Sequence, residues 1–389
     1  MVVREPNPYR PGFNQPPVVF AGRADVLDGA GEALEIAAYD GRTPRPLILV
    51  GPRGVGKTVT LGEISDLAAK RHSWPTVSIE AKASGMLREL CTRLERAGRL
   101  LDGQQVDTGR RRRPRVSGGK LEAKAFGIGG EVQLEADRDE GDDVDVAAAL
   151  HATMRIAVTI GAGIVITLDE LQNADPEELH ILGGVLQESV PDRWPLVTAI
   201  AALPTLRSNR GRRKLPTYLE RAEWHELGGL APSDALEALT GPARQAGRPL
   251  TRDAAASLVS LAGGYPYALQ VAGHFAWRAS HGSSSITLAH TRKAAPRIQA
   301  DLVQLFKGRW DDASPREREY LQALANAAQR VPAPTGGEVA AELGVAVTSV
   351  SYLRDRLLKK GTIYPDAAGG LHFITPGMGE WVSGGRRSD

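Results

Sequence analysis

The chain has 389 residues, a formal net charge of +2 and a single cysteine, Cys91. This length exceeds one ordinary hydrophobic core and predicts two or three domains. The 42% hydrophobic and 24% charged residues are typical of a globular protein and exclude an extended disordered chain. Because the net charge is nearly zero, it does not indicate a nucleic-acid partner. Such a partner would have to be inferred from local basic patches. One cysteine excludes an internal disulfide and indicates a reducing compartment.

No segment has the pattern of a membrane or secretion signal. The N-terminal extension, residues 1–19, carries prolines and charges but no apolar run like that of a signal peptide. The apolar stretch at 156–168 is too short to cross a bilayer. We therefore expect a cytoplasmic protein with no membrane partner.

A complete phosphate-binding loop is the most specific motif of the chain. It follows a short apolar strand at 46–50 and precedes the start of a helix, and this strand–loop–helix order is the context that the motif requires. Its glycines let successive N–H groups face phosphate oxygens, and Lys57 is expected to reach the β and γ phosphates of ATP. The hydroxyl of Thr58 is expected to bind Mg²⁺. The loop consists of Gly51, Pro52, Arg53, Gly54, Val55, Gly56, Lys57 and Thr58.

Two adjacent carboxylates supply the second half of an ATP site. Asp169 and Glu170 end an apolar run at 163–168, which predicts a strand buried on both faces of a parallel sheet. Asp169 is expected to orient Mg²⁺, and Glu170 is expected to polarise the attacking water. We therefore predict an ATPase with Mg²⁺ as cofactor.

The chain alternates strands and helices on either side of these motifs. Strands are predicted at 74–80 and 194–202, and helices around Cys91 and at 176–188. This alternation predicts an α/β nucleotide-binding core over 20–230, with a mostly parallel sheet and ATP at the carboxyl ends of its strands.

Residues 103–145 interrupt that alternation. A basic cluster at 110–115 is followed by a period-two pattern about the glycines at 127–130, which predicts a β-hairpin, and then by an acidic run at 135–145. The insert is either a solvated excursion whose charges cancel or a hairpin that contacts DNA or a neighbouring subunit. The same two readings apply to a second basic cluster at 207–214.

Two smaller domains are predicted after the core. Residues 231–305 carry helical apolar spacing and predict a bundle that covers the nucleotide as a lid. Residues 308–384 predict a winged helix, with helices from Ser314, before Gly344 and at 348–360, followed by two strands. In the last of these helices one face is predicted to contact duplex DNA: Ser349, Tyr352, Arg356 and Lys359. Winged helices also bind proteins, so a protein partner stays open.

With these motifs the chain resembles the AAA+ ATPases, and more closely the branch of the archaeal and eukaryotic origin-recognition initiators and their bacterial relatives. The resemblance runs from about Asn7 to Val382. It implies that the segment ending at Arg23 closes over adenine and that Pro266 belongs to the lid element beside the nucleotide. It also implies that Arg221 is an arginine finger acting across a subunit interface in a homo-oligomer. Without the resemblance, Arg221 would be a solvated charge or a member of a local ion pair.

Two positions depart from that family. Ala202 stands at the tip of the fourth strand, where relatives usually carry a polar sensor, and the region near Pro266 replaces a second sensing arginine. Each such group contributes about 2–4 kcal/mol to lowering a barrier, so we expect slow hydrolysis.

The sequence therefore predicts an AAA+ ATPase that binds and slowly hydrolyses ATP to control DNA binding and self-assembly. This is the class of initiators, loaders and transposition regulators. The alternative is a signalling or defence NTPase of the STAND type that acts through a protein effector. The sequence contains no second set of catalytic residues and therefore does not predict an enzyme that acts on a small metabolite.

Overall fold

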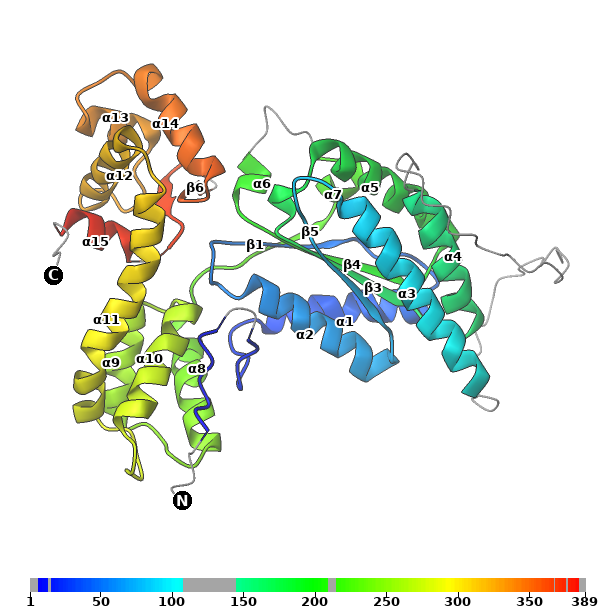
Figure 1. Cartoon of the computed structure of the whole chain (residues 1–389), viewed down its shortest axis with the longest axis horizontal. Helices are drawn as coiled ribbons and strands as arrows, with labels where there is room; N and C mark the ends of the chain where they lie inside the picture. Colours follow the sequence, from blue (N-terminus) through cyan, green and yellow to red (C-terminus); the bar gives the residue numbers. More distant parts are fainter. Residues whose placement is uncertain are drawn as a thin grey trace, which may run out of the picture.

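Three units follow one another along the chain: an α/β core, a four-helix unit and a C-terminal helical domain (Figure 1). The computed structural model describes residues 6–12, 15–107, 145–208, 215–366, 368–375 and 377–384. The predicted hairpin, the basic cluster at 110–115 and nearly all of the acidic run lie outside the described residues. So do residues 209–214 and the side chain of Arg207, and with them the second basic cluster.

The predicted parallel sheet is confirmed. Among the described residues it has five strands in the order β2-β3-β4-β1-β5, all parallel. Four of the strands match the predicted apolar runs, whereas the polar edge strand β5 has no such run and was not predicted. The strands are β1 (Leu47–Val50), β2 (Thr76–Glu80), β3 (Ile164–Asp169), β4 (Leu196–Ala202) and β5 (Glu223–Glu226).

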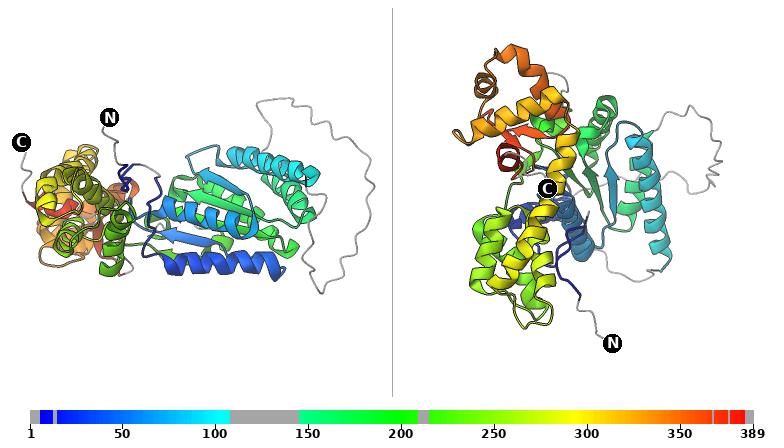
Figure 2. Two further views of the ribbon diagram at one scale, coloured as in Figure 1. Left: turned by 90° about the horizontal axis from the view of Figure 1, so that it is seen from below. Right: turned by 60° about the vertical axis from the view of Figure 1, so that its left-hand side comes forward.

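Helices cover both faces of this sheet, as Figure 2 shows in its left-hand view. Because successive strand residues point to opposite faces, Leu49 packs with α1 and α2 while Ile48 packs with α3, α4 and α5. The covering helices are α1 (Ala24–Tyr39), α2 (Lys57–His72), α3 (Met86–Asp107), α4 (Val146–Thr159) and α5 (Pro176–Glu188). Short turns complete the core: η1 (Leu171–Asn173), η2 (Val190–Asp192), α6 (Thr205–Ser208) and α7 (Thr217–Glu220).

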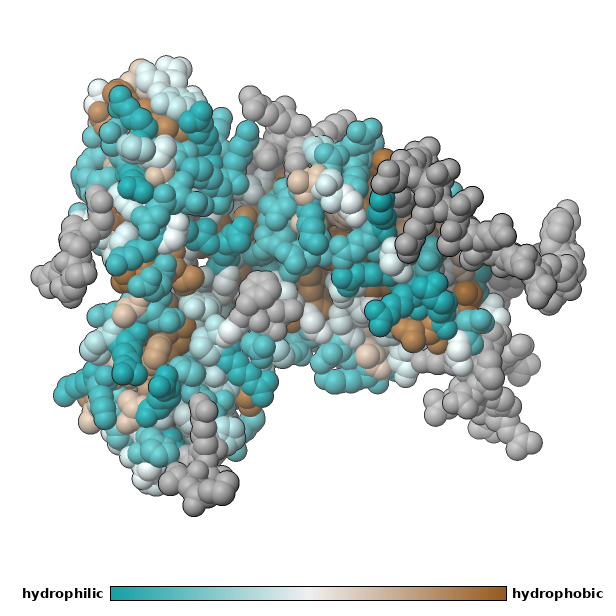
Figure 3. Space-filling model, viewed as in Figure 1, coloured by the Kyte–Doolittle hydropathy of each residue, from teal (hydrophilic) through white to brown (hydrophobic). Residues whose placement is uncertain are grey.

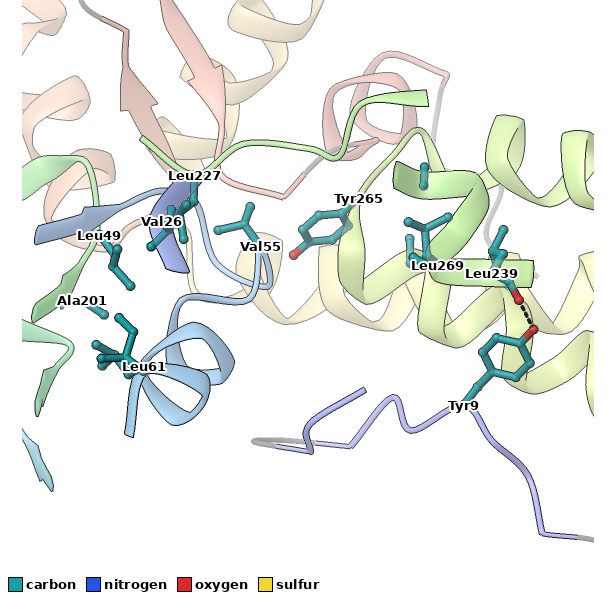
Figure 4. Packing of buried hydrophobic residues seen from close by; sticks show 14 of the residues in the cluster. Tyr9, Val26, Leu49, Val55, Leu61, Ala201, Leu227, Leu239, Tyr265 and Leu269 are labelled. Carbon is teal, nitrogen blue, oxygen red and sulfur yellow. Dashed lines mark hydrogen bonds between the residues drawn. The ribbon is translucent and has the colours of Figure 1, made fainter. Parts of the chain in front are cut away.

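The four-helix unit shares a hydrophobic core with one face of the sheet. Val55 of the phosphate loop, Tyr265 and Leu269 belong to a single buried cluster that runs from α1 and α2 into this unit (Figure 4). The unit consists of α8 (Pro232–Gln245), α9 (Arg252–Ala262), α10 (Pro266–Ala279) and α11 (Leu288–Asp311). The two units are therefore packed together.

The N-terminal segment (residues 6–12) is fastened to the four-helix unit. The ring of Tyr9 is 2% exposed, and its hydroxyl donates a 2.5 Å hydrogen bond to the carbonyl of Leu239 (Figure 4). The amide of Asn7 donates to the carbonyl of His274 at 3.2 Å. A Cβ at Gly273 would come within 2.3 Å of the Tyr9 ring, so glycine is required there for the close approach.

A continuous helix links the four-helix unit to the C-terminal domain. The boundary that the sequence placed between 305 and 308 falls inside α11, which runs on to Asp311. Beyond it, two antiparallel strands follow a set of helices. These elements are α12 (Pro315–Ala328), α13 (Gly336–Glu342), α14 (Val347–Lys359), β6 (Ile363–Pro365), β7 (Leu371–Phe373) and α15 (Met378–Ser383).

Mostly hydrophilic residues cover the face seen in Figure 3, with scattered hydrophobic patches. Within the described ranges, no helix combines the length and the apolar character that a membrane span needs.

A buried carboxylate joins the start of α12 to the end of α14. Glu317, 1% exposed, accepts hydrogen bonds from the Ser314 backbone N–H and from Lys360 Nζ, both at 2.7 Å. Burial alone would raise the pKa of Glu317, but these hydrogen bonds outweigh it and lower the pKa. The ionised form is therefore part of the folded C-terminal domain.

We predict that Glu317→Ala destabilises the protein by about 2 kcal/mol, because two donors lose their buried acceptor. The midpoint of thermal unfolding measures this effect. The control is Glu319→Ala on the same helix, whose side chain is 55% exposed and pairs with Arg316. It should change stability by less than about 1 kcal/mol. Because the pKa of Glu317 is lowered on folding, its contribution is present near neutral pH and is lost in acid. Equal midpoints for the two variants would contradict the assignment.

Candidate nucleotide site

The phosphate loop connects β1 to α2 in a conformation that depends on its glycines. Gly56, just before α2, has φ +94°, which side-chain-bearing residues rarely adopt. A Cβ at Gly51 would lie 2.2 Å from the carbonyl oxygen of Leu227, so only glycine fits there. The loop therefore curls tightly between β1 and the segment that leaves β5.

Lys57 is buried beneath this loop. It is 5% exposed, and its Nζ donates hydrogen bonds of 2.9 Å to the carbonyls of Gly51 and Pro52. Burial lowers the pKa of Lys57 to about 8, although the negative charges of Glu170 and Asp169 oppose the shift. The ammonium group is thus held next to the hollow of the loop, where an anion would replace its carbonyl partners.

The loop and the tip of β3 meet through a hydrogen bond. Thr58 Oγ1 donates to Asp169 Oδ2 at 2.5 Å, and the Glu170 backbone N–H donates to Asp169 Oδ1 at 2.8 Å. Burial raises the pKa of Asp169, and these two hydrogen bonds act in the opposite direction. Hydroxyl and carboxylate oxygens are the ligands that Mg²⁺ prefers. The residues predicted to hold the metal therefore lie together and fit it.

This oxygen pair is too small to enclose a cation alone. Within the described parts of the chain, no group of three or more His, Cys, Asp or Glu side chains gathers as a metal site. Mg²⁺ commonly takes one or two protein ligands and completes its shell with phosphate and water oxygens. The Thr58–Asp169 pair suits that manner of binding.

Glu170 follows Asp169 at the rim of the same hollow. Its backbone has φ +52°, an uncommon conformation for a residue with a side chain, and its carboxylate is 21% exposed. Arg53 Nη2 lies 3.9 Å from Glu170 Oε2, and the Gln172 amide donates to the same oxygen at 2.5 Å. The carboxylate is therefore held between the phosphate loop and the turn η1.

A cavity of about 470 Å³ opens over these residues. Of the predicted nucleotide-binding residues, Arg23 and Pro266 line it together with the loop from Arg53 to Thr58, whereas Gly51 and Pro52 do not. Arg23 Nη2 donates to the carbonyls of Val55 at 3.2 Å and Gly228 at 2.7 Å. Burial lowers the pKa of Arg23, with the charge of Asp234 opposing it. Arg23 thus connects the phosphate loop to the segment that leads from β5 into the four-helix unit.

Sequence reasoning missed two walls of this cavity. Arg10, Pro11 and Gly12 of the N-terminal segment line it, although nothing in their local pattern indicates a contact with residues more than 200 positions away. From the four-helix unit, the Tyr265 hydroxyl donates to the Arg53 carbonyl at 2.5 Å. Burial raises the pKa of Tyr265. The resemblance implied a place beside the nucleotide for the neighbouring Pro266 but no role for Tyr265.

Arg221 lies outside this cavity. It follows α7 and precedes β5, whose first residue, Glu223, is in register with Leu47 at the start of β1. The phosphate loop follows Val50, at the opposite ends of these parallel strands. The Arg221 side chain is exposed, and it cannot belong to the hollow of its own chain.

The predicted DNA-contacting residues also lie elsewhere, on α14. All four are exposed, while Val350, Leu353 and Leu357 on the opposite face are buried. The guanidinium of Arg356 lies 5.5 Å from the ring centre of Tyr352. The exposed set is Ser349, Tyr352, Arg356 and Lys359.

Two parts of the chain match models of known protein domains. Residues 19–198 match the model of the AAA ATPase domain, and residues 303–382 match a domain of unknown function (DUF8462). No curated protein matches this chain in sequence.

Solved structures match over nearly the whole chain. The Walker-type ATPase PABY2304 of Pyrococcus abyssi has a TM-score of 0.60 at 15% identity, covering 93% of this chain and 96% of its own. Cdc6p from Pyrobaculum aerophilum has a TM-score of 0.49 at 13% identity, with 96% and 95% covered. The ORC1 protein of Aeropyrum pernix, solved in complex with DNA, has a TM-score of 0.45 at 16% identity, with 94% and 93% covered.

At these identities a structural likeness establishes the fold alone. The TM-score of 0.60 to the Walker-type ATPase supports that conclusion. Residues 19–198 are similar to AAA ATPase domains, and the chain has the fold of AAA+ P-loop NTPases.

Proposed function

We propose that this protein binds and slowly hydrolyses ATP, and that the nucleotide controls its self-assembly and its binding to duplex DNA. The observation that carries the proposal is that Lys57, Thr58 and Glu170 line one cavity, with Asp169 hydrogen-bonded to Thr58. The structural similarity to AAA+ proteins supports the ATPase part, and the exposed face of α14 supports the DNA part.

Each residue at the cavity has a distinct role in the proposed hydrolysis. The loop N–H groups and Lys57 bind the phosphates, and Lys57 exchanges its carbonyl partners for phosphate oxygens. Thr58 and Asp169 would hold Mg²⁺, which supplies positive charge against the phosphate oxygens when bound. Glu170 accepts a proton from the attacking water. Arg23, Pro266 and the N-terminal segment surround the remainder of the nucleotide, with the four-helix unit as the lid.

Slow turnover is proposed because the tip of β4 lacks a polar side chain. Ala202 ends that strand, and its methyl side chain can neither donate nor accept a hydrogen bond. Loss of one such group costs about 2–4 kcal/mol of barrier lowering. A slow ATPase acts as a timed switch between two assembly states.

Self-assembly would complete the site with Arg221 from a neighbouring subunit. Its exposure and its distance from its own phosphate loop suit a residue that acts in a second chain. A positive charge supplied in this manner can raise the hydrolysis rate by about 10³–10⁵-fold. ATP would then bridge two subunits, and hydrolysis would release them.

The C-terminal domain is proposed to be a winged helix, with α14 as the DNA-contacting helix and β6 and β7 as the wing. Arg356 and Lys359 would contact phosphates, which give most of the affinity in this mode.

A second candidate function is a STAND-type switch that signals to a protein effector. One contact favours it: Gly361, in the turn after α14, lies against the nucleotide site. A Cβ placed there would be 3.0 Å from Leu203 Cδ1 and 3.9 Å from Arg53 Nε. Arg309 Nη1 of α11 also donates to the Gly361 carbonyl at 3.1 Å. In this reading the nucleotide regulates an intramolecular contact, and hydrolysis is indifferent to DNA and to protein concentration.

We predict that Lys57→Ala weakens ATP binding at least about a hundredfold, because the phosphates lose their buried cation. Glu170→Gln should keep ATP affinity and lower turnover by about 10²–10⁴-fold. Equilibrium binding of a fluorescent ATP analogue and steady-state phosphate release measure the two effects. Lys70→Ala, at an exposed position on the same helix, is the control and should match the parent protein. Unchanged ATP affinity in Lys57→Ala would refute this site.

We predict that Arg221→Ala lowers turnover at least about a hundredfold at high protein concentration, because the assembled site loses a positive charge. Mixing Arg221→Ala with Lys57→Ala should restore activity, since one supplies the loop and the other the arginine. The exposed Arg155→Ala serves as the control. Specific activity of the parent protein should rise with concentration and with duplex DNA. A flat rate, with no recovery on mixing, would favour the switch.

We predict that Arg356→Ala weakens binding to duplex DNA and lowers the slope of log affinity against log salt by about 1, as loss of one phosphate contact requires. Fluorescence anisotropy across a salt series measures both quantities. Arg316→Ala removes the same charge from α12, where the side chain is 75% exposed, and should leave the slope unchanged. If both variants behave alike, α14 does not contact the DNA.

A further inference from the structure

The side-chain amide of Gln172 lies at the tip of β4, where Ala202 carries no polar side chain. Its Nε2 donates to Glu170 Oε2 at 2.5 Å, and its Oε1 accepts from the backbone N–H of Leu203 at 2.8 Å. Leu203 is the residue directly after β4. One side chain therefore bridges the carboxylate at the tip of β3 and the backbone at the tip of β4.

The turn η1 carries Gln172 into this position. Glu170 adopts the left-handed conformation, and the Asn173 N–H donates to the Glu170 carbonyl at 2.8 Å, which closes the turn. Leu171 is fully buried and fixes the turn against the core. Gln172 is thereby directed back over Glu170 instead of outward.

The chemistry of the bridge determines which end of the amide faces which partner. A backbone N–H can only donate, so the Gln172 carbonyl oxygen must face Leu203. The NH₂ group then faces the carboxylate, which can only accept when ionised. A glutamate at this position could accept from Leu203 but could not donate to an ionised Glu170.

We propose that Gln172 is a positioning residue for ATP hydrolysis that orients the carboxylate of Glu170 from the tip of β4. By holding Oε2 of Glu170, on the side where Arg53 also lies, it leaves Oε1 to accept the proton of the attacking water. This inference rests on the proposed ATPase function. It assigns Gln172 no contact with the nucleotide, so its loss affects the rate and not the affinity.

The test compares Gln172→Ala and Gln172→Glu with Gln187→Ala, an exposed position on α5. We expect both Gln172 variants to lower kcat at least about tenfold, while KM and the affinity for a fluorescent ATP analogue stay within about twofold. Gln172→Glu keeps an oxygen for the Leu203 N–H, so its thermal midpoint should stay closer to that of the parent protein than that of Gln172→Ala. A loss of kcat in that variant cannot then be assigned to a damaged fold.

A double-mutant cycle with Glu170→Gln tests whether Gln172 acts through Glu170. If it does, Gln172→Ala should not lower further the residual rate of Glu170→Gln. An equal loss in both backgrounds, a parent-like kcat or a kcat above the parent would each overturn the proposal. Absence of hydrolysis by the parent protein would instead refute the proposed function, which keeps the two failures distinct.

Discussion

The phosphate loop follows β1, the acidic pair follows β3, and β4 lies between these two strands. The hydrogen bond from Thr58 to Asp169 spans that gap and joins residues 111 positions apart in the chain. Between them β4 ends in Ala202, whose carbonyl accepts a hydrogen bond from the N–H of Gly51 at 3.3 Å. The phosphate loop is thus hydrogen-bonded directly to the end of β4.

Burial shifts the pKa values of two groups at this site. Removal from water lowers the pKa of Lys57 and raises that of Asp169, and in both cases the opposite charge of the other group acts against the shift. A negatively charged ligand bound together with a divalent cation would change the charge environment of Lys57 and of Asp169 at the same time. The loop and the tip of β3 are therefore joined by electrostatic attraction as well as by the hydrogen bond from Thr58 to Asp169.

Local patterns in the sequence predicted the parts of the fold that depend on local chemistry. Apolar runs identified β1 to β4, and the glycine spacing identified the phosphate loop with Lys57 and Thr58. The strand β5 was not predicted because an edge strand is half exposed and its residues, Glu223 to Glu226, are mostly polar. The contacts of Tyr9, Tyr265 and Gln172 were not predicted because each depends on where distant elements pack. The hydroxyl of Tyr9, for example, binds a carbonyl 230 positions away.

The helix α11 has 24 residues and is common to the four-helix unit and the C-terminal domain. At 1.5 Å per residue it is about 36 Å long. Near its C-terminal end Arg309 donates to the carbonyl of Gly361, the residue that lies against Arg53 of the phosphate loop. The helix therefore passes into the C-terminal domain beside the nucleotide site, so a displacement of Arg53 would reach α14 directly through the turn that follows it.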